Sequence, residues 1–86
     1  MEEEKEYHTR YLRAINNPIR RKICRSLIGG CKTITEIKSN TGLKTTMLKW
    51  HLDILEYGFC VEKDTKSGYP SYKLTQEGEV IHYLDR

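Results

Sequence analysis

The spacing of apolar residues changes at Gly58, and this change restricts the possible folds more than any other feature of the sequence. Before Gly58, apolar residues recur three or four positions apart, which predicts amphipathic helices. After it, FCVEK (59–63) and YPSYKL (69–74) read as short strands around the polar turn DTKSG (64–68). We therefore expect a mainly α-helical chain with one β-hairpin near its C-terminal end.

Capping residues divide the helical part into separate helices. Asn17 and Pro18 suit the N-cap and first position of a helix, and Gly29-Gly30 suits its end. A very short strand is expected at residues 33–35, where threonines flank Ile34, and Thr33 also has Glu36 at capping-box spacing. The predicted helices span about 4–16, 18–28, 36–40, 45–57 and 76–85, the last capped by Thr75.

This order of elements predicts a winged helix-turn-helix. Two helices joined by the tight turn at Thr41-Gly42 form the helix-turn-helix, and the hairpin that follows is the wing. With 86 residues the chain is expected to be a single domain, 1–86, with residues 1–5 as the candidate for disorder.

Composition points to a cytoplasmic protein without a membrane segment. No apolar run reaches the roughly 18 residues of a membrane span, and the acidic start MEEEKEY has no apolar stretch typical of a secretion signal. The cysteines, Cys24, Cys31 and Cys60, are odd in number and widely spaced, so we expect free thiols.

Positive charge is concentrated in the middle of the chain. Residues 18–50 contain Glu36 as the only acid and eight bases: Arg20, Arg21, Lys22, Arg25, Lys32, Lys38, Lys44 and Lys49. The net charge of that segment is +7. The whole chain has a net charge of +3, so the remaining residues together carry −4. The asymmetry favours a polyanionic partner, although a solvated basic face would have the same charge. Arg20, Arg21 and Arg25 are accordingly candidates for phosphate contacts or for a solvated face.

The helix predicted over 45–57 has two different faces. Leu48, Leu52 and Leu55 fall on one side, with His51 beside them as a half-buried histidine, and we expect this side to pack inward. The opposite side and the N-terminal tip carry small, basic or aromatic residues: Lys44, Thr45, Thr46, Lys49, Trp50 and Asp53. Such residues at the beginning of a helix suit contact with phosphates and base edges of duplex DNA.

Three segments of this chain resemble the ArsR-like winged helix-turn-helix transcriptional regulators, including small archaeal ones. They are INNPIRRKICRSLIGG (15–30), ITEIKSNTGLKTTMLKWHLDILEYGFC (34–60) and YKLTQEGE (72–79). The resemblance covers about residues 12–79. It implies a homodimer that regulates transcription by sequence-specific binding to double-stranded DNA, with the helix at 45–57 in the major groove.

By position, the resemblance assigns DNA contacts to specific residues. They are Lys44, Thr45, Thr46, Lys49 and Trp50, with Lys66 and Ser67 in the wing, 64–68, on the DNA backbone. The chain departs from the family at two places. Metal-sensing members carry Cys-x-Cys where this chain has Thr33 and Thr35, and a residue as large as Trp50 is unusual on the groove-facing side.

Other functions leave weaker signals. We expect no enzyme, because the sequence shows no nucleophile–base pair and no phosphate-binding glycine loop. The presence of Trp50 and Asp53 on the helix at 45–57 is also compatible with a protein-interaction module. A sequence-independent architectural DNA binder is a further alternative function. One face of the last predicted helix carries Glu79, His82 and Asp85, a spacing that could ligate zinc. Such spacing is common by chance and a solvated polar face explains it as well, so we expect no metal or other cofactor.

The dimer is expected to form through the first and last helices. Both carry apolar side chains at the ends of a small domain, and a small core gains from association. The residues concerned are Tyr7, Tyr11, Ile81 and Leu84. The same side chains could instead close the core of the monomer.

Overall fold

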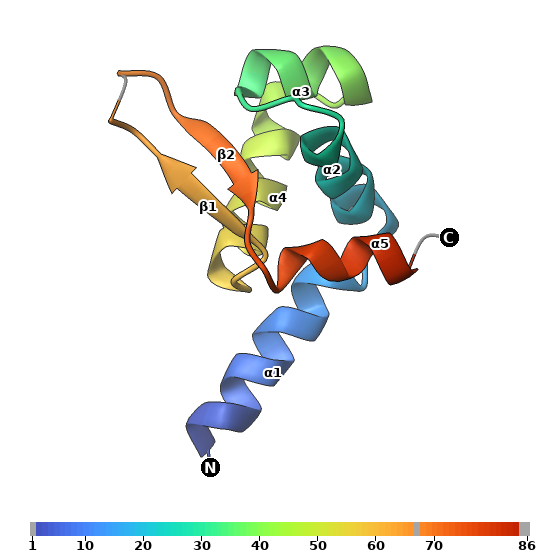
Figure 1. The fold of residues 1–86 in the computed structure, drawn as a ribbon, viewed down its shortest axis with the longest axis vertical. Coiled ribbons are helices and arrows are strands. Elements are labelled where there is room, and N and C mark those ends of the chain that lie inside the picture. The colour runs from blue at the N-terminus through green and yellow to red at the C-terminus, as the bar shows by residue number, and fades with distance from the viewer. Residues whose placement is uncertain (1, 67, 85–86) are drawn as a thin grey trace.

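A computed structural model describes residues 2–66 and 68–84 of the chain. Its elements, in order, are α1 (Glu2–Ile15), α2 (Pro18–Ile28), α3 (Ile34–Thr41), α4 (Thr45–Tyr57), β1 (Val61–Asp64), β2 (Ser71–Leu74), the 3₁₀ turn η1 (Gly78–Val80) and α5 (Ile81–Leu84). The two strands pair antiparallel, with Val61 opposite Leu74, and project from the helices as a wing (Figure 1). The expected winged helix-turn-helix is therefore confirmed.

Two predicted caps set the helices of the helix-turn-helix unit. The side chain of Asn17 accepts hydrogen bonds from the backbone N–H groups of Ile19 and Arg20, at 2.9 and 3.1 Å. At the start of α3, Thr33 and Glu36 form the capping box, in which each side chain accepts from the other's backbone N–H. Gly42 then takes a left-handed conformation, with φ of 74°, and turns the chain into α4.

The structure corrects the prediction in two short segments. The strand expected at residues 33–35 is reduced to one bridge between Thr33 and Ser71, because the capping box starts α3 at Ile34. The last helix is shorter than 76–85: Thr75 does cap this segment by accepting from the N–H of Gly78, but a 3₁₀ turn precedes the short α5. Residues 2–5, the candidate for disorder, are part of α1 in the structure, whereas Met1 lies outside the described residues.

The core lies where α4 meets the other helices and the base of the hairpin. The predicted inward side of α4 is confirmed, because Leu48, Leu52 and Leu55 are fully buried. Their neighbours in the core come from every other part of the fold: Ile15, Ile23, Ile37, Val61, Tyr72 and Ile81. Burial of Ile81 shows that the beginning of the last helix closes the monomer.

The end of α4 passes very close to α1 at Gly58. A Cβ atom at this position would collide with the Cβ of Ala14 and would lie 2.7 Å from the carbonyl oxygen of Arg10. Only glycine allows this approach without moving a backbone. The crossing holds the C-terminal half of α1 against the C-terminal end of α4.

Arg20 also links α1 to α4. Its side chain is buried, and its guanidinium donates to the carbonyl oxygens of Ala14 and Arg13 at 2.9 and 2.7 Å. It also donates to Nδ1 of His51 at 3.2 Å. An arginine has no acceptor, so Nδ1 of His51 must be unprotonated. His51 was expected to be half-buried, but it is buried and its partner is a cation.

This contact makes stability depend on pH. Burial, and then the charge of Arg20, lower the pKa of His51 below its ordinary value of 6.5. The unfolded chain therefore takes up the proton first, and the free energy of unfolding should fall as pH drops from 6.5 toward the lower pKa of the folded state. We expect urea denaturation at pH 7.5 and at pH 5.5 or so to reveal this loss. His51→Gln, which keeps an acceptor but does not titrate, serves as the control, and an equal loss in both proteins would contradict the assignment.

Candidate nucleic-acid interface

The beginning of α4 presents the predicted polar face to solvent. Lys44, Thr46 and Lys49 are exposed and Thr45 is half-buried. No side chain caps the first N–H groups of this helix, whose N-cap position is Lys44. Free N–H groups and the helix dipole give such an end a positive potential, and the two lysines add to it.

The turn of the wing lies near the same end of the molecule. In Figure 1, the beginning of α4 and the β1–β2 turn lie toward the end opposite the N-terminus of α1. Lys66 is exposed in this turn, and its backbone N–H donates to the side chain of Asp64 at 2.8 Å. Ser67, the other residue predicted in the wing, lies outside the described residues.

Part of the basic middle segment is not available to a polyanion. The guanidinium of Arg20 is buried, so the sequence-based candidates for phosphate contact included one residue that is structural. Arg21 donates to the carbonyl oxygen of Ile15 and to the side chain of Asn16, at 2.9 and 3.0 Å. The charge of +7 over residues 18–50 therefore overstates the basic surface.

Trp50 is a surface residue on the second turn of α4. Its side chain is 57% exposed, and its ring meets the ring of His51 edge-on at 4.9 Å. It is not part of the core, so a role in packing the monomer is limited to this contact. The side chain is accessible to DNA, to another protein or to a small molecule.

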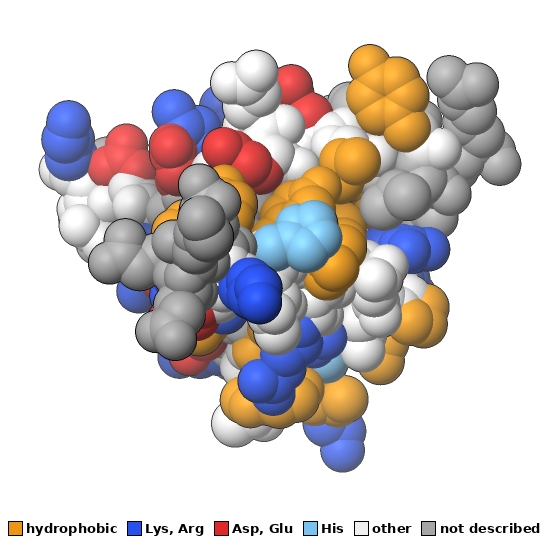
Figure 2. Space-filling model, turned by 90° about the horizontal axis from the view of Figure 1, so that it is seen from below, with side chains coloured by type: hydrophobic (Ala, Val, Ile, Leu, Met, Phe, Trp, Pro, Cys, Tyr) orange, Lys and Arg blue, Asp and Glu red, His pale blue; other side chains and the backbone are white. Residues whose placement is uncertain are grey.

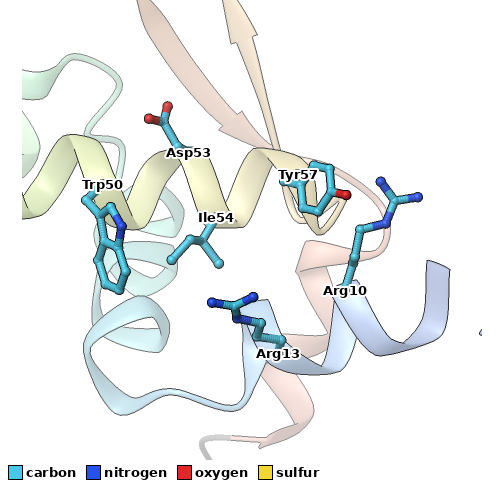
Figure 3. A pocket seen from close by; sticks show the side chains of 6 residues that line it. All are labelled: Arg10, Arg13, Trp50, Asp53, Ile54 and Tyr57. Carbon is cyan, nitrogen blue, oxygen red and sulfur yellow. The ribbon is translucent and has the colours of Figure 1, made fainter. Parts of the chain in front are cut away.

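A cleft that the sequence did not predict lies beside Trp50, between α1 and α4 (Figure 3). Its lining residues are Arg10, Arg13, Trp50, Asp53, Ile54 and Tyr57. The two helices lie far apart along the chain, and their residues come together only through the crossing at Gly58 and the contacts of Arg20. No pattern in the sequence links them.

The face formed by α1 and α5 is partly apolar. Figure 2, which views the molecule from the end that bears α1, shows hydrophobic side chains grouped near the middle of this face. Tyr7 stacks on Phe59 with ring centroids 4.3 Å apart, and the hydroxyl of Tyr11 donates to the carbonyl oxygen of Glu77, so both tyrosines serve the monomer. Leu12 and Tyr83 remain 38% and 70% exposed.

Two of the three cysteines, Cys24 and Cys60, are buried, and Cys31 is half-buried. All three are free, and burial raises the pKa of Cys24 to about 12 and that of Cys60 to about 11. Residues 2–66 and 68–84 contain no cluster of histidine, cysteine or acidic side chains suited to a metal ion. Of the three residues considered for zinc, Asp85 and the side chain of His82 lie outside what the structure describes.

No helix in the described part of the chain has the length and apolar character needed to cross a bilayer.

Comparison with known proteins relates the fold to bacterial regulators. No protein-family model and no curated protein matches the sequence. Among solved structures, the homodimeric winged helix-turn-helix DNA-binding domain of Mb0332 from Mycobacterium bovis, a possible ArsR-family regulator, superposes with a TM-score of 0.81 at 22% identity, over 92% of this chain and 75% of that one.

Two further structures have the same arrangement. NolR from Sinorhizobium fredii matches with a TM-score of 0.78 at 24% identity, over 96% of this chain and 85% of that chain. The transcriptional repressor BigR from Xylella fastidiosa matches with a TM-score of 0.76 at 21% identity, over 98% and 88%. These three structures come from bacteria, so the resemblance to small archaeal regulators stays a prediction. The resemblance to ArsR-like regulators is confirmed in the fold: this chain is a winged helix-turn-helix of the kind found in these regulators.

Proposed function

We propose that this protein is a transcriptional regulator that binds double-stranded DNA sequence-specifically as a homodimer. The observation that carries the proposal is the exposed, uncapped and basic beginning of α4, held in place by a buried leucine stripe. A helix mounted in this way can enter the major groove without disturbing the core behind it. The related fold of Mb0332, which is described as a DNA-binding domain, supports the same conclusion.

Each predicted contact residue has a role in this proposal. Thr46 and Lys49 read base edges, because they lie on the exposed side of the first turns of α4. Lys44 and Thr45 hold phosphates at the helix tip. Lys66 and Ser67 contact the backbone from the wing, and Trp50 contacts DNA beside the groove.

The proposed homodimer forms through α1 and α5. The exposed Leu12 and Tyr83 on this face, together with the homodimeric state of Mb0332, support the assignment. A two-fold axis here would place both copies of α4 on one side of the duplex, about 34 Å apart in successive major grooves. Binding requires no catalysis and no cofactor, and the cytoplasm is the compartment that we propose for it.

Salt dependence tests the proposal as a whole. Two or three lysines or arginines per subunit, with Lys44 and Lys66 among them, would neutralise about four to six phosphates per dimer. The slope of log affinity against log salt concentration should then be roughly −4 to −5 for duplex DNA. Fluorescence anisotropy with a duplex selected from a random library, and with an unselected duplex, measures both the slope and the preference. Absence of binding at low salt would favour the protein-interaction alternative, and equal affinity for the two duplexes would favour the architectural one.

Single substitutions separate base reading from phosphate contact. Lys49→Ala should reduce binding to the selected duplex preferentially, by about 1–3 kcal/mol. Lys66→Ala should weaken both duplexes about equally, since the wing contacts only backbone. Trp50→Ala should lower affinity with little change in melting temperature, because its side chain is largely exposed. A Trp50→Ala protein that is stable, dimeric and fully active in DNA binding would remove Trp50 from the interface.

Charge placed on the α1–α5 face tests the dimer. Leu12→Glu should produce monomers in sedimentation velocity at tens of micromolar protein, because it buries a carboxylate in an apolar interface. Leu12 is partly exposed in the monomer, so the folded state should survive, which circular dichroism checks. Ile28→Glu, an exposed position on α2, is the matched control. If the unaltered protein sediments only as a monomer, the dimer proposal is wrong.

A further inference from the structure

The cleft between α1 and α4 has the features of a small-molecule site, and neither the fold nor the proposed function assigns it a role. Its volume is about 230 Å³. We propose that this cleft binds a small planar aromatic carboxylate. The apolar wall, the charged wall and the size of the cleft each support this ligand class.

The apolar wall of the cleft comes from α4. Figure 3 shows the side chains of Trp50 and Ile54 extending from α4 into the gap that separates this helix from α1. An indole beside a branched aliphatic side chain forms a flat surface that suits an aromatic ring. The exposure of Trp50 leaves its ring free to stack on such a ligand.

The charged wall comes from α1. Arg13 extends across the gap toward Trp50 and Ile54, whereas Asp53 points to the other side of α4 (Figure 3). Among the described residues, the side chain of Arg13 has no hydrogen-bond or carboxylate partner. Burial lowers the pKa of Arg20, and the nearby positive charge of Arg13 lowers it further. A planar guanidinium that no carboxylate of the described residues already binds is suited to pairing with a ligand carboxylate through two parallel hydrogen bonds.

Arg10 lines the other end of the cleft, where Figure 3 places its guanidinium beside Tyr57 and away from Trp50. Its guanidinium carbon lies 4.4 Å from the centre of the Tyr57 ring and 4.9 Å from that of Phe59. Its Nε is buried and lacks a hydrogen-bond acceptor in the part of the chain that the structure describes. Arg10 therefore closes this end of the cleft together with Tyr57, and Arg13 is the cation that faces Trp50.

The size of the cleft restricts the ligand. Its volume is below the roughly 300–1,000 Å³ of sites for drug-sized molecules, so one ring or two fused rings with a carboxylate fill it. A free phosphate or a DNA phosphate could also pair with Arg13, but neither would use the wall formed by Trp50 and Ile54. The proposed ligand therefore differs from a simple anion in requiring both a negative charge and a flat apolar ring.

Fluorescence of Trp50, the only tryptophan of the chain, reports binding without any DNA in the assay. Titration of the full chain with benzoate should give a saturable change in the roughly millimolar range expected for so small a ligand. Three compounds serve as controls: benzamide lacks the charge, cyclohexanecarboxylate lacks the planar ring, and inorganic phosphate lacks any ring. Each should bind at least about ten-fold more weakly than benzoate, a difference of about 1.4 kcal/mol. Equal binding of benzamide or phosphate would overturn the proposal.

Variants locate the binding site. Arg13→Gln should weaken benzoate binding at least about ten-fold, while Lys22→Gln, which removes an exposed charge from α2, should leave it unchanged. The carbonyl of residue 13 that holds Arg20 is retained in Arg13→Gln, so the fold should persist. If that variant does not fold, nuclear magnetic resonance on the unaltered chain decides: benzoate must shift the Trp50 indole N–H and the Ile54 methyl signals. Shifts located elsewhere, or an unchanged affinity in folded Arg13→Gln, would refute the site.

This inference does not rest on the proposed function, because its readouts involve no DNA. If both hold, benzoate should reduce affinity for the selected duplex, since the ligand covers Trp50. Binding of benzoate without any DNA binding would refute only the regulator proposal. DNA binding with no benzoate response at Trp50 would refute only the ligand site.

Discussion

The buried guanidinium of Arg20 holds three helices of this protein together. It comes from α2, holds the last carbonyl oxygens of α1 and meets the imidazole of His51 on α4. A buried charge is costly unless its donors are satisfied, and the backbone acceptors satisfy these at fixed distances. The three helices can therefore meet only in one relative orientation, which also requires a neutral His51.

That orientation gives α4 two separate tasks. The leucine side of α4 is buried in the core. The first turns of this helix are exposed at one end of the molecule, and its N-cap residue makes no side-chain capping hydrogen bond. The close approach at Gly58 sets the distance between α4 and α1, and the cleft beside Trp50 is a consequence of it. The surface proposed for DNA and the site proposed for a small carboxylate thus share Trp50. A ligand bound to α1 and α4 could change DNA binding without any large movement of the fold.

Charge along the chain and charge on the surface are different quantities in this protein. Arg20 and Arg21 contribute to the basic middle segment, yet their guanidinium groups are occupied by carbonyl and amide oxygens near the end of α1. The remaining lysines at the beginning of α4 and in the wing are exposed. Electrostatic attraction for a polyanion therefore depends on fewer cations than the sequence suggests, but these are placed at one end of the molecule.

Elements that depend on local chemistry could be predicted from the sequence. The Asn17 cap, the capping box of Thr33 and Glu36, and the periodic leucines of α4 act within a few residues, so the helix-turn-helix and the two faces of α4 could be predicted from them. The prediction of a strand at residues 33–35 was wrong because the capping box, which starts a helix at this point, outweighed the β-propensity of these residues. The burial of Arg20, its hydrogen bond to His51 and the position of Arg13 opposite Trp50 became apparent only in the folded chain. These depend on contacts between segments distant along the chain, and local spacing carries no information about which of them will meet.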